Sequence, residues 1–162
     1  MKTAIYPGTF DPITLGHIDV IKKSLKIFDR VVVATTDNIN KNYFFSIDER
    51  LSIIKNSLFK DLKLNKKKIM VIPFDSLTID LCKKYKSMVI IRGLRAVSDF
   101  EYEFQLAGMN KKLNSSIETM FLMSDVENQI ISSKFVKEIT KLNGNINKFV
   151  TKSTAKILKN KF

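Results

Sequence analysis

Residues that could bind and align phosphate groups are spread over four separate turns of the sequence. They supply an imidazole, an ammonium, two guanidiniums and several hydroxyls. Side chains of these kinds, together with the free N–H groups of helix starts, recognise a ligand that carries several phosphates. The residues concerned are Thr9, His17, Lys41, Arg92, Arg95, Ser132 and Ser133.

The first of these turns, residues 6–17, is the most specific. It reads Tyr-Pro-Gly-Thr-Phe-Asp-Pro-Ile-Thr-Leu-Gly-His and contains the only histidine of the chain. A short apolar run precedes it and a 3.6-residue apolar pattern follows, so it joins a strand to a helix. It matches neither the P-loop pattern nor the Gly-x-Gly-x-x-Gly pattern. An ordinary loop punctuated by proline and glycine is the plain alternative.

Alternating strand and helix patterns indicate how the turns are brought together. They predict an α/β fold: a single Rossmann-like domain with a five-stranded parallel sheet and helices on both faces. In such a sheet the turns after the strands share one edge, where ligands bind. The expected strands are 2–6, 30–36, 68–73, 87–92 and 117–123, and the expected helices are 18–28, 46–58, 77–85, 99–113, 133–142 and about 151–161.

The helix expected over 99–113 carries two kinds of side chain on different faces. An apolar stripe contains Phe100, Phe104 and Ala107, and a polar face contains Asp99, Glu103 and Asn110. No boundary, linker or repeat divides the chain, so residues 1–162 are interpreted as one domain.

The composition limits the classes of function. The formal charge of +12 and pI of about 9.8 suit polyanions, but the lysines are scattered and lack interleaved aromatics. A solvated lysine-rich surface is therefore favoured over a nucleic-acid site. Cys82 is the only cysteine and is expected to be a buried packing thiol. No metal-ligand spacing, membrane span or signal peptide is evident, which favours a cytoplasmic protein.

The chemistry expected at this edge depends on placement and charge. No Ser/His/Asp set is evident, because the only histidine lies in the phosphate turn. Alignment of two bound reactants can supply about 7–11 kcal/mol. A group transfer between phosphorylated molecules, without a protein nucleophile, fits these residues.

Four runs in order are similar to the bacterial phosphopantetheine adenylyltransferases, which belong to the nucleotidyltransferases with a T/H-x-G-H motif. The resemblance extends from Lys2 to at least Phe149. The matching runs are 4–14 with 16–19, then 91–97, then 99–103, and finally 131–133 with 136–138.

The resemblance implies transfer of the adenylyl group of ATP to 4′-phosphopantetheine, giving dephospho-coenzyme A and pyrophosphate. The acceptor phosphate attacks directly in line, with no covalent enzyme intermediate. Mg²⁺ is expected on the ATP phosphates, with no metal bound by protein ligands. A cytoplasmic homohexamer, with no nucleic-acid or membrane partner, and feedback inhibition by coenzyme A are inherited expectations.

Site residues follow from the same resemblance. The catalytic residues are His17, Lys41 and Arg92. The residues expected to bind phosphopantetheine are Thr9, Lys41, Thr78, Arg92 and Asn110. The residues expected to bind ATP are Thr9, Phe10, His17, Gly93, Leu94, Arg95, Glu103, Asn128, Gln129, Ile130, Ile131, Ser132, Ser133 and Lys134.

Each assignment has a structural alternative. His17 could cap or pack at a helix start, and Ser132 and Ser133 could be simple N-caps. The arginines could form surface ion pairs with Asp99 or Glu101.

The chain also departs from the family pattern. Asn128 replaces an aromatic residue, Lys134 a third serine, and Gly108 a histidine, while Asn42-Tyr43 stands where Lys-Pro is usual.

Two rival functions remain open at the level of the sequence. A sister nucleotidyltransferase with another acceptor would keep the same turns, although the run 92–95 argues against it. A basic nucleic-acid-binding module would use the charge of +12 and would bind with steep salt dependence.

Overall fold

A parallel sheet of five strands organises the chain. The computed structural model describes residues 1–38, 41–95 and 97–162, and within the helix that starts at Val97 it describes side chains from Phe100 onward. The strand order is β3-β2-β1-β4-β5, and every neighbouring pair is parallel. The strands are β1 (Thr3–Gly8), β2 (Arg30–Thr36), β3 (Ile69–Phe74), β4 (Val89–Leu94) and β5 (Glu118–Met123).

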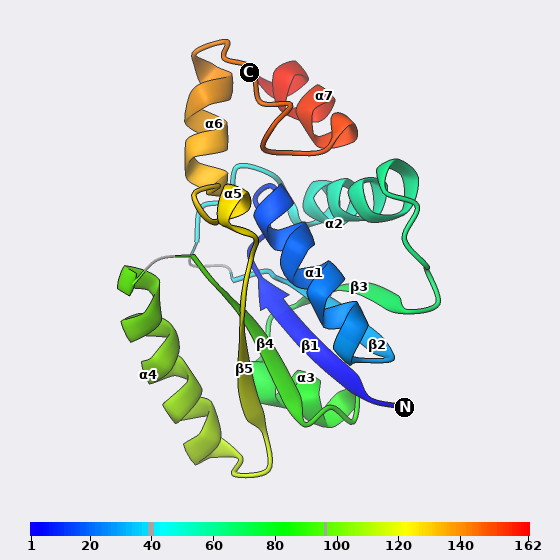
Figure 1. Cartoon of the computed structure of the whole chain (residues 1–162), viewed down its shortest axis with the longest axis vertical. Coiled ribbons are helices and arrows are strands. Elements are labelled where there is room, and N and C mark those ends of the chain that lie inside the picture. Colours follow the sequence, from blue (N-terminus) through cyan, green and yellow to red (C-terminus); the bar gives the residue numbers. More distant parts are fainter. Residues whose placement is uncertain (39–40, 96) are drawn as a thin grey trace.

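Buried residues of the central strands separate two apolar clusters, one on each face of the sheet. Side chains such as Ala4 and Val31 join the larger cluster, under α1 (Leu15–Ile27) and α2 (Ile47–Lys55). Their neighbours Ile5 and Val32 point the other way and pack against α3 (Thr78–Lys84). The alternation follows from the two-residue repeat of a strand. The expected α/β fold, with helices on both faces, is confirmed (Figure 1).

The helices match the expected segments, with differences at their ends. A four-residue helix, α5, occupies part of a segment predicted to be a loop, and α2 continues as a π-helix, η1. The capping box predicted at Ser46 is present, with Glu49 closing it. The helices are α1 (Leu15–Ile27), α2 (Ile47–Lys55), η1 (Asn56–Asp61), α3 (Thr78–Lys84), α4 (Val97–Leu113), α5 (Val126–Gln129), α6 (Ser133–Lys141) and α7 (Lys152–Lys161).

Helix α4 turns a residue of its polar face inward. Phe100 and Phe104 are exposed, by 44% and 63%, while Glu103 is buried at 9%. The two phenylalanines of the apolar stripe therefore stay largely exposed on this chain, although the Phe100 ring lies 6.1 Å from that of Phe121 in β5. The side chain of Asp99, expected on the polar face, lies outside the described residues.

The strand order predicts where a ligand would bind. The chain moves outward from β1 through β2 to β3, then crosses to β4 on the other side of β1. The point where the direction reverses lies between β1 and β4, and open parallel sheets bind ligands at the carboxyl ends of the strands there. His17 follows β1, and Arg92 lies near the carboxyl end of β4.

Among the helices formed by the described residues, none has the length and apolar character needed to cross a bilayer.

Candidate active site

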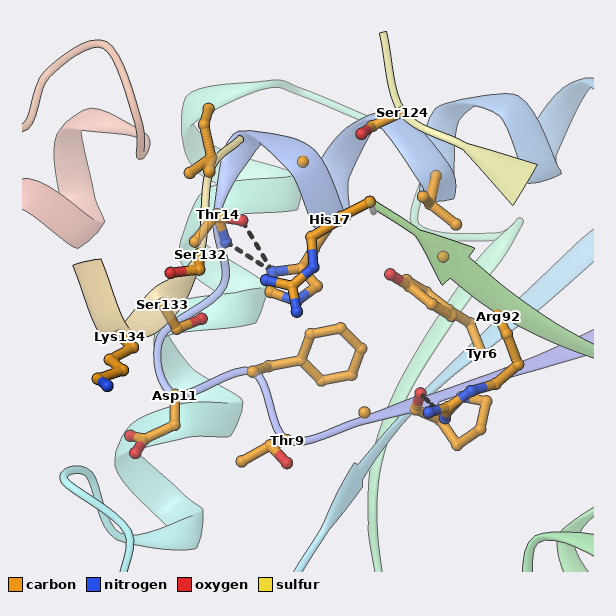
Figure 2. A pocket seen from close by; sticks show the side chains of 18 of the residues that line it. Tyr6, Thr9, Asp11, Thr14, His17, Arg92, Ser124, Ser132, Ser133 and Lys134 are labelled. Carbon is orange, nitrogen blue, oxygen red and sulfur yellow. Dashed lines mark hydrogen bonds between the residues drawn. The ribbon is translucent and has the colours of Figure 1, made fainter. Parts of the chain in front are cut away.

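A cavity of about 570 Å³ opens at this edge of the sheet. Its walls come from the β1–α1 turn, the segment 41–43, the end of β4, one residue of α4, and the start of α6. His17 and Arg92 both line it, so residues separated widely in sequence do meet around one space, as predicted (Figure 2).

Most of the predicted site residues line this cavity. They are Thr9, Phe10, His17, Lys41, Arg92, Gly93, Leu94, Arg95, Glu103, Ile131, Ser132, Ser133 and Lys134. Five predicted residues are not part of the lining: Thr78, Asn110, Asn128, Gln129 and Ile130. Their contacts with substrates stay predictions.

Close packing of aromatic rings fixes the shape of the β1–α1 turn. Phe10 has a left-handed backbone, with φ of 48°, and its ring is buried. The ring meets the edges of Tyr6 and His17, with centroids 5.4 Å and 5.1 Å away. A Cβ at Gly8 would stand 2.7 Å from the Phe10 ring, so only glycine fits there. The turn is thus a preformed support for the imidazole.

The hydrogen bonds of His17 define its protonation. Its Nδ1 accepts the backbone N–H of Thr14 at 3.1 Å, and the Thr14 hydroxyl lies 2.9 Å from the same atom (Figure 2). Nδ1 is therefore the acceptor nitrogen, and Nε2 carries the proton. Burial, and then the positive charge of Arg95, lower the pKa of His17 to about 4. Near pH 7 this side chain is a neutral donor, held by a capping interaction.

Arg92 is paired with Glu103, a carboxylate that had not been considered as its partner from the sequence. Its Nε and Nη2 donate to the two carboxylate oxygens of Glu103, each at 2.6 Å, and Nη1 donates to the carbonyl of Pro7 at 3.1 Å. Although burial acts to lower it, the hydrogen bonds and charge of Glu103 raise the pKa of Arg92. In this structure Glu103 orients Arg92, and its expected contact with the nucleotide stays a prediction.

Asp11 and Lys137 line the cavity without having been given roles from the sequence. The Asp11 carboxylate accepts the backbone N–H groups of Phe44 and Phe45 at 2.8 Å and 2.9 Å, and Lys137 Nζ lies 3.2 Å away. Asp11 therefore ties the β1–α1 turn to the segment that follows Lys41. Both residues stand in the runs that carry the family resemblance, which is the signal that could have found them.

The start of α6 forms another part of the wall. The Ser132 hydroxyl accepts the N–H of Phe135 at 3.1 Å, which makes it the predicted N-cap. The Ser133 hydroxyl donates to the carbonyl of Pro12 at 2.7 Å and so joins α6 to the first turn. Lys134 is exposed at the cavity edge. Free N–H groups at this end favour an anion.

Helix α5 is fastened to α1 by the residue that departs from the family pattern. The Asn128 amide donates to Asp19 at 2.6 Å, and Gln129 donates to the carbonyl of Ser124 at 3.1 Å. The carbonyl of Asn128 would lie 3.0 Å from a Cβ placed on Gly16. Asn128 and Gln129 thus hold the backbone that leads into α6.

The charges around the cavity favour an anionic ligand. Lys41, Arg92, Arg95, Lys134 and Lys137 line it, whereas the lining carboxylates are Asp11 and Glu103, each bonded to one of these cations. Among the described residues, no group of three His, Cys, Asp or Glu side chains could hold a metal ion. The arrangement can neutralise and align phosphates.

Comparisons with known proteins agree with this geometry. Residues 5–139 match the family described as Cytidylyltransferase-like. The chain is 71% identical over 161 residues to a phosphopantetheine adenylyltransferase of Pelagibacter ubique, covering 99% of this chain and 98% of that protein. It is 49% identical to the corresponding Sphingopyxis alaskensis protein, covering 96% and 90%.

Solved structures support the fold. A putative nicotinate-nucleotide adenylyltransferase from Vibrio parahaemolyticus aligns with a TM-score of 0.69 at 20% identity, covering 98% of this chain and 91% of that chain. The Plasmodium falciparum nicotinic acid mononucleotide adenylyltransferase complexed with NaAD aligns with a TM-score of 0.66 at 18% identity, covering 99% and 94%. At these identities the likeness concerns the fold alone. The sequence matches over nearly the full chain place this protein in the phosphopantetheine adenylyltransferase family.

Proposed function

We propose that this protein transfers the adenylyl group of ATP to 4′-phosphopantetheine, forming dephospho-coenzyme A and pyrophosphate, a step of coenzyme A synthesis. One observation carries the proposal: His17, Lys41, Arg92, Arg95 and the start of α6 line one cavity, in a chain of this family. Both substrates carry phosphates, and the cavity gathers cations from three separate segments: the segment after β2, the end of β4 and the start of α6.

The two substrates are assigned to different sides of the cavity. The acceptor phosphate is placed between Thr9, Lys41 and Arg92, which stand on either side of β1. The ATP phosphates are placed between His17, Arg95 and the N-terminus of α6. This division follows the family resemblance, and both sets of residues line the same cavity, where the attacking oxygen can meet the α-phosphorus.

The transfer needs no protein nucleophile. An oxygen of the acceptor phosphate attacks the α-phosphorus, the bond to the bridging oxygen breaks, and pyrophosphate leaves with that electron pair. The Nε2–H of neutral His17 donates to a phosphate oxygen and stabilises the charge that develops there, while cationic Lys41 and Arg92 hold the acceptor. One well-aimed donor is worth about 10²–10³ in rate, and alignment of the reactants supplies the rest.

Mg²⁺ is proposed to accompany ATP as a complex of its phosphates. The described residues offer the ion no cluster of three acidic, His or Cys ligands, and both carboxylates of the cavity are engaged by lysine or arginine. A metal coordinated by the triphosphate, as is usual for nucleotide-bound Mg²⁺, fits this donor set. When bound, it would neutralise charge on the leaving pyrophosphate.

A homo-oligomer, a hexamer by inheritance from the family, is part of the proposal. Large apolar side chains of α4 are exposed in the single chain, among them Tyr102, Phe104 and Met109 at 63–64%. Several large apolar side chains exposed on one helix are what a subunit interface would cover. A cytoplasmic location is proposed with it, in agreement with the expectation from the sequence. Light scattering after size exclusion tests the assembly.

Pyrophosphate release with a panel of acceptors tests the reaction. The purified protein is incubated with ATP, Mg²⁺ and either 4′-phosphopantetheine, nicotinamide mononucleotide or nicotinate mononucleotide. We expect release with phosphopantetheine, with dephospho-coenzyme A identified by mass. Release only with a mononucleotide would replace the acceptor assignment by that of a sister enzyme. CTP in place of ATP tests the choice of nucleotide.

A further inference from the structure

An arginine outside the cavity lining, Arg50 of α2, is the most completely enclosed charged side chain of the described core, with no exposed surface. The sequence analysis gave it no role, because it stands in an ordinary amphipathic helix. Burying a guanidinium carries a desolvation penalty of several kcal/mol unless its N–H groups are satisfied. The identity of its partners therefore indicates what it does.

Arg50 donates four hydrogen bonds to four residues in three segments. Its Nη1 donates to the carbonyl of Thr9 at 3.1 Å and to that of Thr36 at 2.7 Å. Its Nε donates to the carbonyl of Phe45 at 3.1 Å, and its Nη2 to Asp37 at 3.3 Å. The guanidinium thus joins the β1–α1 turn, the end of β2, and the start of α2.

The same guanidinium also supports the segment that carries Lys41. Its carbon lies 3.8 Å from the centre of the Tyr43 ring, a stacking contact. The Tyr43 hydroxyl accepts the backbone N–H of Asn38 at 3.0 Å, and the carbonyl of Asn38 accepts the N–H of Lys41 at 3.0 Å. Tyr43 and Lys41 both line the cavity.

We propose that Arg50 is a positioning residue of the transfer: by bonding Thr9 and stacking on Tyr43, it sets the separation between the Thr9 turn and Lys41. This inference rests on the proposed function, which places both residues against the acceptor phosphate. The side chain acts through Thr9 and Lys41 and does not itself touch the substrate. Only an arginine can serve, because its planar donors reach several carbonyls while its face stacks on a ring.

The main test replaces Arg50 by lysine, whose single ammonium keeps the charge but cannot reach all four acceptors. We expect Arg50→Lys to raise the KM for phosphopantetheine about tenfold and to lower kcat by up to about 100-fold, as expected for a misplaced reacting group. The KM for ATP should change much less. Unchanged kinetic constants in the folded variant would overturn the proposal.

Three further variants separate positioning from folding. Arg30→Lys, at the opposite end of the sheet, is the matched substitution and should leave kinetics unchanged. Leu58→Ala, in the buried core of η1, should lower the melting temperature without moving either KM. If Arg50→Lys does not fold, Tyr43→Leu takes its place, because the Tyr43 ring that Arg50 stacks on is only half-buried and its loss should be tolerated. The KM for phosphopantetheine should again rise much more than the KM for ATP. Equal or unchanged KM values would refute the proposal.

The wild-type protein is first assayed with each acceptor, and the acceptor that supports turnover is used for all variants. An error in the proposed acceptor is then visible in the wild type alone. An error in the role of Arg50 is visible only in the comparison of Arg50→Lys with Arg30→Lys.

Discussion

Two segments at the cavity, the β1–α1 turn and the stretch from α5 to the start of α6, are held in place by different means. The β1–α1 turn is buried along most of its length, from Phe10 to Thr14, and aromatic packing and the Arg50 and Asp11 contacts hold it from several sides. The segment from α5 to the start of α6 is more exposed, with Val126 and Ile130 at about 80%, and Ile131 is its only buried residue. It depends on individual side-chain hydrogen bonds from Asn128, Gln129 and Ser133.

This difference indicates a division of work. Groups that must be aligned to a fraction of an ångström stand on the rigid turn, as expected for a reaction that depends on placement. The segment from α5 to the start of α6 contributes few residues to the core, so we expect it to belong to the less stable part of the fold. Changes in the turn should therefore alter turnover, and changes in α5 or α6 should alter nucleotide affinity.

Replacement of His17 is expected to have the largest effect. His17→Ala removes the neutral donor from the rigid turn, so kcat should fall by about 10²–10³, while the Kd for ATP changes modestly. Single-turnover kinetics and equilibrium binding of ATP measure the two quantities. His17→Gln, which keeps an amide donor, should recover part of the rate. Wild-type turnover in His17→Ala would show that His17 does not stabilise the charge that develops in the reaction.

The pKa of His17, measured by NMR titration, reports how buried the rigid turn is. The chain has one histidine, so the spectrum should contain one set of imidazole signals to follow. Its pKa should be about 4 in the free protein, below the ordinary 6.5, because of burial and Arg95. Bound pyrophosphate should raise it. A pKa near 6.5 would show that the turn is more open than described.

The same shift predicts how stability depends on pH. Between pH 6.5 and 4 the unfolded chain binds a proton at His17 that the folded chain does not. The contribution of the residue is therefore complete above pH 6.5 and is lost as the pH falls toward 4, by at most roughly 3 kcal/mol. The free energy of unfolding, measured by urea at several pH values from 4 to 7, should change less with pH in His17→Gln than in the wild type.

The Arg92–Glu103 pair joins β4 to α4 and should give an intermediate effect. Glu103→Gln removes the charge that orients Arg92, so we expect the KM for phosphopantetheine to rise about tenfold, with a loss of about 1–3 kcal/mol in stability from the weakened pair. Arg92→Ala should raise that KM further. A larger rise in the KM for ATP than for the acceptor, in either variant, would reverse the assignment of the two sides.

The sequence indicated the fold closely, because the signals were local. Runs such as Val31–Ala34 predict a buried strand by composition, and the observed strands begin and end within two residues of the expected ones. Helix α5 was missed since four residues are too short for a periodic pattern. The pattern of α4 did not show which of its faces turns inward, because a period shows which residues share a face, while tertiary packing decides which face is buried.

The site was recovered to a different degree. The identities of the cavity residues came from motifs, and most of them meet as expected. The residues that support them were not found from the sequence, because their bonds join distant parts of the chain or because they lie in an ordinary amphipathic helix. Asp11 bonds to residues 33 and 126 positions away, and Arg50 bonds to Thr9, 41 positions away. No local spacing encodes such pairings. The family assignment needed only the motifs and is confirmed by the comparisons.

Lys134 provides the smallest expected effect and tests the exposed segment against the turn. It stands in the first turn of α6, where a positive charge opposes the helix dipole, at a cost of about 0.3–1 kcal/mol. Lys134→Ser should therefore make the protein slightly more stable.

If the ammonium contacts the triphosphate, the same change should weaken ATP binding up to about fivefold, as for an exposed charge pair, with kcat unchanged. Calorimetric titration with ATP at two salt concentrations measures this, because a lysine–phosphate contact weakens with salt. An unchanged affinity together with higher stability would make Lys134 a surface residue only, and a fall in kcat would show that the exposed segment shares in the chemistry assigned to the turn.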